Sequence, residues 1–254
     1  MTEPHCHVRS ISMPTRSHPI TVEIEKILRT LRTSELSTRL KSETINVHLA
    51  GLIEAYNCIE DLLQLPLTQQ GMSSRCHEKW IEDELNESVR LLDVCSTAKD
   101  VLLQMKDQAQ DLQTVLRSRG SEADKQQKVR AYLCFRKKMN KNINKCLGEL
   151  KRMDTTSVPT SLVSQDQHQE MVIKVVKEVR EITISFFHTL LSFISSPALK
   201  PKSRKWSLVS KFIHNGKKGL EALETSIKDL ETGLQCLFKR LIEFRVTLLN
   251  ICTQ

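Results

Sequence analysis

The stretch LEALETSIKDLETGLQCLFKRLIEFRVTLLNI, Leu220 to Ile251, carries the clearest structural signal in the chain. Its apolar residues recur in alternating steps of three and four positions without a break. An apolar stripe at this period lies on one side of a helix and packs against neighbouring helices, as in bundles and coiled coils. The stripe consists of Leu220, Leu223, Ile227, Leu230, Leu234, Leu237, Leu241, Phe244, Leu248 and Ile251.

The same spacing recurs in three further long stretches, and the composition agrees with a helical fold. The chain has 254 residues, with 7 Gly, 7 Pro and 4% aromatic residues. Gly and Pro interrupt helices and aromatic residues favour strands, so their scarcity favours helices. The length is ample for a real core. We therefore predict an all-α fold, an antiparallel bundle of four long helices with two or three short additional helices.

The expected organisation is a tail followed by one domain. Residues 1–18 mix Pro, Ser, Thr, His and Arg without a helical period, so a flexible N-terminal tail is expected there. Residues 19–254 are expected to form a single helical-bundle domain. Linkers are expected near 154–164 and 196–204, where Pro and Ser recur.

Individual Pro, Asn and Gly residues predict where helices begin and end. Pro19 is expected to open the first helix. Pro66 is expected to end the second helix, which begins near Glu43. After the second linker, Asn215 and Gly216 are expected to break a short helix before the final long one begins.

Cysteine usage and hydropathy bear on the compartment. The eight cysteines contain no CxxC pair, and no secretory signal opens the chain. Free thiols in a reducing compartment are therefore expected, and with them a cytoplasmic location; membrane association stays open, and a plastid is less favoured. The apolar run from Ile182 to Leu199 falls short of the roughly 20 residues that a membrane span needs. It is interpreted as a buried core helix.

Signatures of catalysis are absent from the sequence. The GxSxG, HExxH, GxGxxG and P-loop motifs do not occur, and adjacent Cys and His residues lack the spacing of a closed zinc site. Glu82, Asp83, Glu84 and Glu87 are interpreted as a solvated helix start that the helix dipole favours. We therefore expect no catalytic residue, no metal and no cofactor, and hence no enzyme.

Charge is distributed unevenly along the chain. Arg117–Arg152 carries twelve Lys and Arg against three acids, a net charge of +9, and Lys200–Lys218 carries seven Lys and Arg with no acid. Because the whole chain is +8, the remaining residues sum to about −8. Basic blocks of this kind attract polyanions such as phospholipid headgroups, nucleic acid or an acidic protein face.

The segment 200–218 interleaves cations with aromatic and aliphatic residues, as an interfacial helix does. The competing interpretation is a solvated loop and a short helix whose aromatic residues cap the bundle. Nucleic acid is an unlikely partner by sequence, because no known binding motif accompanies the basic stretches. The candidate anion- or lipid-binding residues are Lys200, Lys202, Arg204, Lys205, Trp206 and Lys211. The candidate phosphorylation sites, where added negative charge would weaken anion binding, are Ser10, Ser12 and Ser207.

Six strings, in order along the chain, are characteristic together. They are HVRSISMPTRSHP (His7 to Pro19), DLLQLPLTQQ (Asp61 to Gln70), LLDVCSTAKDVLLQMK (Leu91 to Lys106), EVREITISFFHTLLSF (Glu178 to Phe193), KWSLVSK (Lys205 to Lys211) and GLQCLFKRLIEFRVTLLNI (Gly233 to Ile251). These strings resemble a plant-specific family catalogued as domain of unknown function 241 and grouped with the BYPASS proteins. The resemblance implies a helical land-plant protein without an assigned enzymatic activity, related to proteins of root and shoot development.

Three functions remain open on the sequence. The leading hypothesis is a non-catalytic helical scaffold or regulatory protein that acts in plant development through contacts with an unidentified protein partner. The alternative is a peripheral membrane protein that binds anionic lipid through residues 200–218. An enzyme or small-ligand carrier using the bundle core is third. A homo-oligomer is also open, because the same heptads serve contacts within one chain or between chains.

Overall fold

The computed structural model describes residues 18–35, 42–74, 79–118, 120–155, 167–195 and 207–253. All regular structure in these ranges is helical, which confirms the all-α fold. The seven helices are α1 (Pro19–Glu35), α2 (Ser42–Leu63), α3 (Pro66–Ser73), α4 (Lys79–Arg117), α5 (Glu122–Thr155), α6 (Gln167–Ser195) and α7 (Ser207–Thr253).

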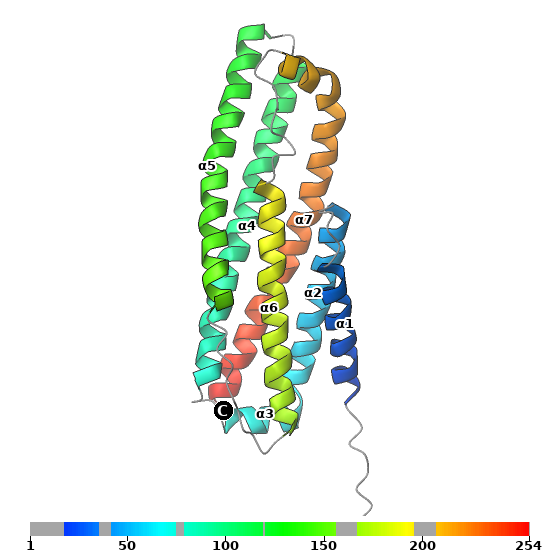
Figure 1. Ribbon diagram of the computed structural model, residues 1–254, viewed down its shortest axis with the longest axis vertical. Helices are drawn as coiled ribbons and strands as arrows, with labels where there is room; N and C mark the ends of the chain where they lie inside the picture. Colours follow the sequence, from blue (N-terminus) through cyan, green and yellow to red (C-terminus); the bar gives the residue numbers. More distant parts are fainter. Residues whose placement is uncertain are drawn as a thin grey trace, which may run out of the picture.

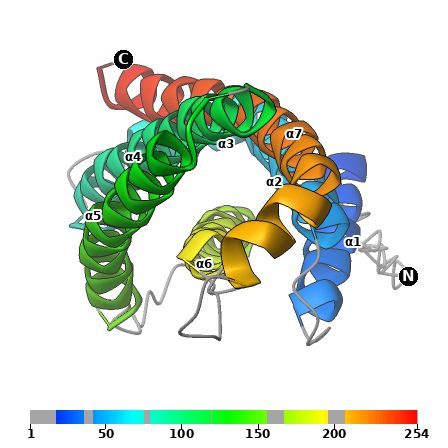
Figure 2. The ribbon, with the colours of Figure 1, turned by 90° about the horizontal axis from the view of Figure 1, so that it is seen from above.

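Five helices form a curved layer in the order α5, α4, α7, α2 and α1, and α6 fills its concave side (Figure 2). The short α3 crosses the lower end of this arrangement in Figure 1. The neighbours α2 and α7 run in the same direction, whereas α4 and α7 are antiparallel (Figure 1). The antiparallel bundle of four long helices is therefore not confirmed, because α6 packs inside a layer of helices that includes one parallel pair.

The apolar stripe of α7 lies in the core, as its spacing predicts. Its eight members from Ile227 to Ile251 are each at most 4% exposed. Full burial of one such side chain stabilises the folded state by about 1.5–3 kcal/mol, so the stripe accounts for a large share of the packing energy. The run that begins at Ile182 belongs to α6, where Phe186 and Phe187 are fully buried. Among the described helices, none is both long and apolar enough to cross a membrane.

Two local expectations differ from the structure. The predicted break at Asn215 and Gly216 is wrong, because α7 continues as one helix from Ser207 to Thr253. A Gly inside a helix costs only about 0.5–1 kcal/mol relative to Ala, which a long helix tolerates. Pro66 follows the end of α2 as expected, but it also opens α3 after Leu65, because Pro fits the first turn of a helix.

The expected tail and linkers fall mostly outside the described residues. Residues 1–17 and 196–206 are not described, and the expected division into a tail and one domain stays a prediction. Of the first expected linker, Asp154 and Thr155 still belong to α5, and residues 156–166 are not described.

Candidate functional site

The candidate sites named from the sequence lie almost entirely outside the described part of the chain. This holds for the two serines of the tail and for residues 200–206 of the basic segment. Ser207 and Lys211 lie in the first turns of α7, where the structure describes the backbone alone. Their roles in phosphorylation and anion binding therefore stay predictions.

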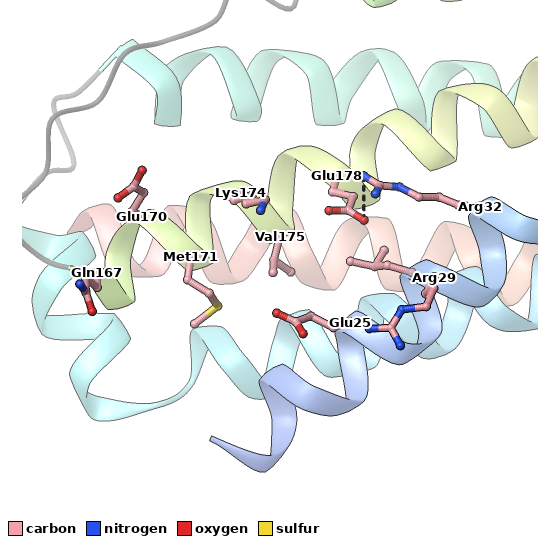
Figure 3. A pocket seen from close by; sticks show the side chains of 10 residues that line it. Glu25, Arg29, Arg32, Gln167, Glu170, Met171, Lys174, Val175 and Glu178 are labelled. Atoms are coloured by element: carbon pink, nitrogen blue, oxygen red, sulfur yellow. Dashed lines mark ion pairs between the residues drawn. The ribbon is translucent and has the colours of Figure 1, made fainter. Parts of the chain in front are cut away.

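A cleft of about 460 Å³ lies between the middle and end of α1 and the first turns of α6. Leu28 of α1 and Met171 and Val175 of α6 supply its apolar surface, and charged side chains surround them (Figure 3). Its lining consists of Glu25, Leu28, Arg29, Arg32, Gln167, Glu170, Met171, Lys174, Val175 and Glu178.

The charged lining of the cleft is balanced between the two signs, with three acids and three bases. One ion pair spans the cleft, with Arg32 Nη2 3.0 Å from Glu178 Oε1 (Figure 3). The Arg32 side chain is 60% exposed, so this pair adds little stability. A mixed rim around an apolar floor suits an amphipathic peptide segment better than a small anion, since it offers both signs of charge and apolar area together.

Inside the molecule, four polar side chains meet between α2, α4 and α6. Glu84 Oε2 and Arg180 Nη1 are 2.6 Å apart, and these side chains are 3% and 11% exposed. The hydroxyl of Thr183 donates to the carbonyl of Val179 at 2.7 Å. Because a Thr hydroxyl has one hydrogen, the hydroxyl of Tyr56 donates in turn to Thr183, at 3.1 Å. We call Tyr56, Glu84, Arg180 and Thr183 the buried polar cluster.

Burial dominates the acid–base behaviour of this cluster. It raises the pKa of Glu84 from 4.5 to about 7, although the neighbouring Arg180 guanidinium opposes the shift. Burial likewise raises the pKa of Tyr56 well above its ordinary value. Catalytic groups often show such pKa values, but so do structural pairs inside a protein. The cleft between α1 and α6 is lined by none of these four side chains.

A second set of polar contacts ties α7 to its two neighbours. Arg245 Nη1 donates to the backbone carbonyl of Leu85 and, at 3.1 Å, to the hydroxyl of Ser88 on α4. On the other side, the hydroxyl of Thr247 donates to Glu60 Oε1 of α2 at 2.6 Å. These bonds link different helices and so fix their relative positions.

The buried thiols are poor nucleophiles at neutral pH. Burial raises the pKa of Cys95 to about 12, and its Sγ lies 3.7 Å from the carbonyl of Leu234. Burial also raises the pKa of Cys58 to about 11, with nearby carboxylates adding to the shift. Only the thiolate attacks or binds metal, so neither thiol is activated. In the described ranges Cys58, Cys95, Cys134, Cys146 and Cys236 are in no disulfide, and these ranges hold no group of three or more His, Cys, Asp or Glu that could hold a metal ion.

Comparison with known proteins identifies the family. The family model described as Protein BPS1 matches residues 48–220 and 215–251. The chain belongs to the Protein BPS1 family. This confirms the BYPASS-related resemblance of the sequence. No curated protein and no solved structure matches the chain.

The Protein BPS1 match covers the buried polar cluster but only half of the cleft. Residues 48–251 include α6 and every member of the cluster. Helix α1, which supplies Leu28, Arg29 and Arg32 to the cleft, precedes the matched residues. The cluster therefore belongs to the region shared with the family, and the α1 wall of the cleft lies outside it.

Sequence reasoning missed both sites, and it misjudged Glu84. The interpretation of Glu84 as part of a solvated helix start is wrong, because its side chain is buried against Arg180. A usable signal existed: Glu84 lies seven residues before Leu91, so it continues the apolar stripe of α4. The cleft gave no such signal, since its two walls are separated by more than a hundred residues of chain.

Proposed function

We propose that the protein is a non-catalytic helical scaffold or regulator that acts in plant root and shoot development through contacts with other proteins. Membership of the Protein BPS1 family supports the coarser statement, a role as a plant developmental regulator. The proposal places the protein in the cytoplasm.

The observation that carries this proposal is that buried polar side chains bind one another across helix contacts. Glu84 is bound to Arg180, Tyr56 to Thr183, and Arg245 to the backbone and side chain of α4. Each contact joins two helices. Buried polar side chains that bind one another fix the relative positions of the helices, so recognition of a partner protein falls to the surface.

The cleft between α1 and α6 is the surface feature that best fits a protein contact. Its apolar floor and balanced charges match the amphipathic character of a peptide segment. Arg29 and Lys174 lie on opposite walls and are both exposed, so they can change without disturbing the core.

The test is rescue of a plant line that lacks the gene, scored by root and shoot growth. Arg29→Glu with Lys174→Glu is expected to lower rescue, because two cations of the proposed contact become acids. Lys137→Glu with Lys141→Glu, on exposed positions of α5, is the matched control and is expected to rescue fully. Protein level and circular dichroism establish that both variants are folded.

Conservative interior variants separate a scaffold from a catalyst. Tyr56→Phe and Glu84→Gln remove the proton chemistry of the cluster and keep most of its packing, so a scaffold carrying them is expected to rescue normally. Failure of both variants at wild-type protein levels would contradict the proposal. A reproducible intrinsic turnover by the purified protein would contradict it as well.

An alternative function rests on the basic segment 200–218. Seven Lys and Arg without an acid, interleaved with Trp206 and Phe212, favour a peripheral membrane protein that docks on anionic lipid. In this alternative the cytoplasmic protein is held at a membrane surface by charge and by shallow insertion of aromatic side chains. It predicts lipid binding that depends on salt and on these cations.

A further inference from the structure

An exposed apolar strip follows the contact between α4 and α7. Ile242, Val246 and Leu249 of α7 are 41%, 46% and 39% exposed. Their spacing of four and three residues places them on one face of the helix. Val89 of α4 is 39% exposed and neighbours Ser88, which binds Arg245 of α7. The two helices therefore present these side chains together.

Half-buried residues extend the strip on both helices. Leu92 lies one turn from Ser88, on the side of α4 that faces α7. Phe238 lies one turn from Ile242, and the ammonium of Lys99 on α4 sits 4.6 Å from the centre of its ring. We define the α4–α7 strip as Val89, Leu92, Phe238, Ile242, Val246 and Leu249.

The strip lies on the convex side of the curved layer. Figure 2 shows α6 on the concave side of the layer where α4 meets α7, so we assign the exposed positions along this contact to the convex side. Six apolar side chains gathered on one exposed seam form a surface of the kind that marks a protein contact. The charges beside the strip indicate which surface packs on it.

The two edges of the strip carry opposite charges. On α4, the exposed acids Asp93, Asp100 and Asp107 recur every seven residues, and Asp93 is one turn from Val89. On α7, Lys228 and Lys239 are exposed, the latter with 71% of its side chain accessible and a loose pair to Glu243 at 3.6 Å. An acidic edge thus faces a basic edge across an apolar centre.

The register of the two helices places these charges at matching heights. The antiparallel helices are joined by Arg245 to Ser88 at one end and by Lys106 to Glu231, at 3.2 Å, at the other. Between these contacts, Asp93 lies within about one turn of the height of Lys239. By the same count, Asp107 lies within about one turn of the height of Lys228.

We propose that a second copy of this chain packs on the α4–α7 strip, about a two-fold axis parallel to the helices. That operation sets α4 of each copy opposite α7 of the other at the same height. Asp93 then faces the partner's Lys239, and Asp107 faces the partner's Lys228, each twice. A two-fold axis across the helices would instead set α4 on α4, acids against acids, so the charges select the first arrangement.

The dimensions of the surface predict a weak dimer. From Asp93 to Asp107 the charged edge is about 20 Å long at 1.5 Å per residue, and the strip continues past Asp93 to Val89 and Leu249, which adds about two more turns at that end. Two helices side by side are about 20 Å wide, which gives on the order of 600 Å² per copy. This is below the usual area of a stable complex, so dissociation is expected in the micromolar range.

Sedimentation velocity of the purified full chain, over concentrations from low micromolar to a few hundred micromolar, tests the proposal. The wild type is expected to shift from monomer to dimer. Ile242→Glu with Val246→Glu is expected to weaken dimerisation at least tenfold, because four buried carboxylates would meet in the dimer. The matched control is Val47→Glu with Leu133→Glu, which changes two exposed apolar residues on α2 and α5 and is expected to dimerise normally.

A charge exchange tests the symmetry. Asp93→Lys is expected to weaken the dimer several-fold, since it faces the partner's Lys239, and Asp93→Lys with Lys239→Asp is expected to restore it. A failure of the double variant to restore the dimer overturns the proposed axis. A wild type that stays monomeric at the highest concentration, or a strip variant that dimerises like the wild type, overturns the second copy as occupant. The proposal is independent of the role in plant development.

Discussion

Glu84 is a buried acid whose protonation is coupled to the stability of the fold. Its pKa is raised from 4.5 to about 7 in the folded state, chiefly by burial, so folding favours the protonated form. The stabilisation from that proton is complete below about pH 4.5 and is lost as the pH rises to about 7. The full change is on the order of 3 kcal/mol, since one pKa unit corresponds to about 1.4 kcal/mol. Glu84→Gln, which does not titrate, should lack this term.

Urea unfolding of the wild type and Glu84→Gln at several pH values between 4 and 8 measures that term. From pH 4.5 to pH 7 the unfolding free energy of the wild type is expected to fall relative to that of Glu84→Gln. Above pH 7 the difference between the two proteins is expected to stay constant. Glu82→Gln, at an exposed neighbouring position, is the control and should follow the wild type throughout. A difference that does not change with pH would show that Glu84 keeps an ordinary pKa beside Arg180.

Helices α2 and α7 meet at a glycine, which allows their close approach. A Cβ added at Gly233 would collide with the buried Leu49 of α2, with its Cγ only 3.1 Å away. Gly233→Ala is therefore expected to destabilise the protein by about 1–2 kcal/mol, because overpacking outweighs the gain in helix propensity. Gly148→Ala on α5, where a Cβ meets nothing within 4 Å, should instead stabilise it by about 0.5–1 kcal/mol. Urea unfolding of both variants checks the opposite signs, and equal stability of the two would refute the close contact.

At the level of elements, periodicity predicted the helices well and their ends less well. The stripe of α7 was readable because each of its apolar positions enters the core. The continuity of α7 through Asn215 and Gly216 was not readable, since the low helix propensity of two residues costs little in a long helix. Helix α3 was missed because its eight residues, which begin at Pro66, are too few to show a period. The pairing of Glu84 with Arg180 depends on how α4 and α6 meet, which no local pattern contains.

Across the whole molecule, the positive charge is concentrated away from the acids. The chain is +8 overall, yet Arg117–Arg152 alone is +9 and Lys200–Lys218 is +7. On α5 the basic side chains Lys137, Lys138, Lys141 and Lys145 are exposed along the edge of the curved layer (Figure 2). Either block can attract an anionic surface, but only residues 200–218 combine cations with Trp and Phe. The two basic blocks are therefore expected to contribute differently to binding at a membrane surface.

Changing Lys200, Lys202, Arg204 and Lys205 to Glu is expected to lower binding to anionic liposomes at least tenfold, because each cation near such a surface contributes about 1 kcal/mol. Sedimentation with anionic and with neutral liposomes at near-physiological salt measures it, and wild-type binding should be selective for the anionic vesicles and fall as salt rises. The control changes Lys137, Lys138, Lys141 and Lys145 to Glu, which alters the net charge equally and should keep most of the binding. Equal losses in both variants would assign binding to net charge alone. Absence of wild-type binding would remove the membrane alternative and leave protein contacts as the route by which the chain acts.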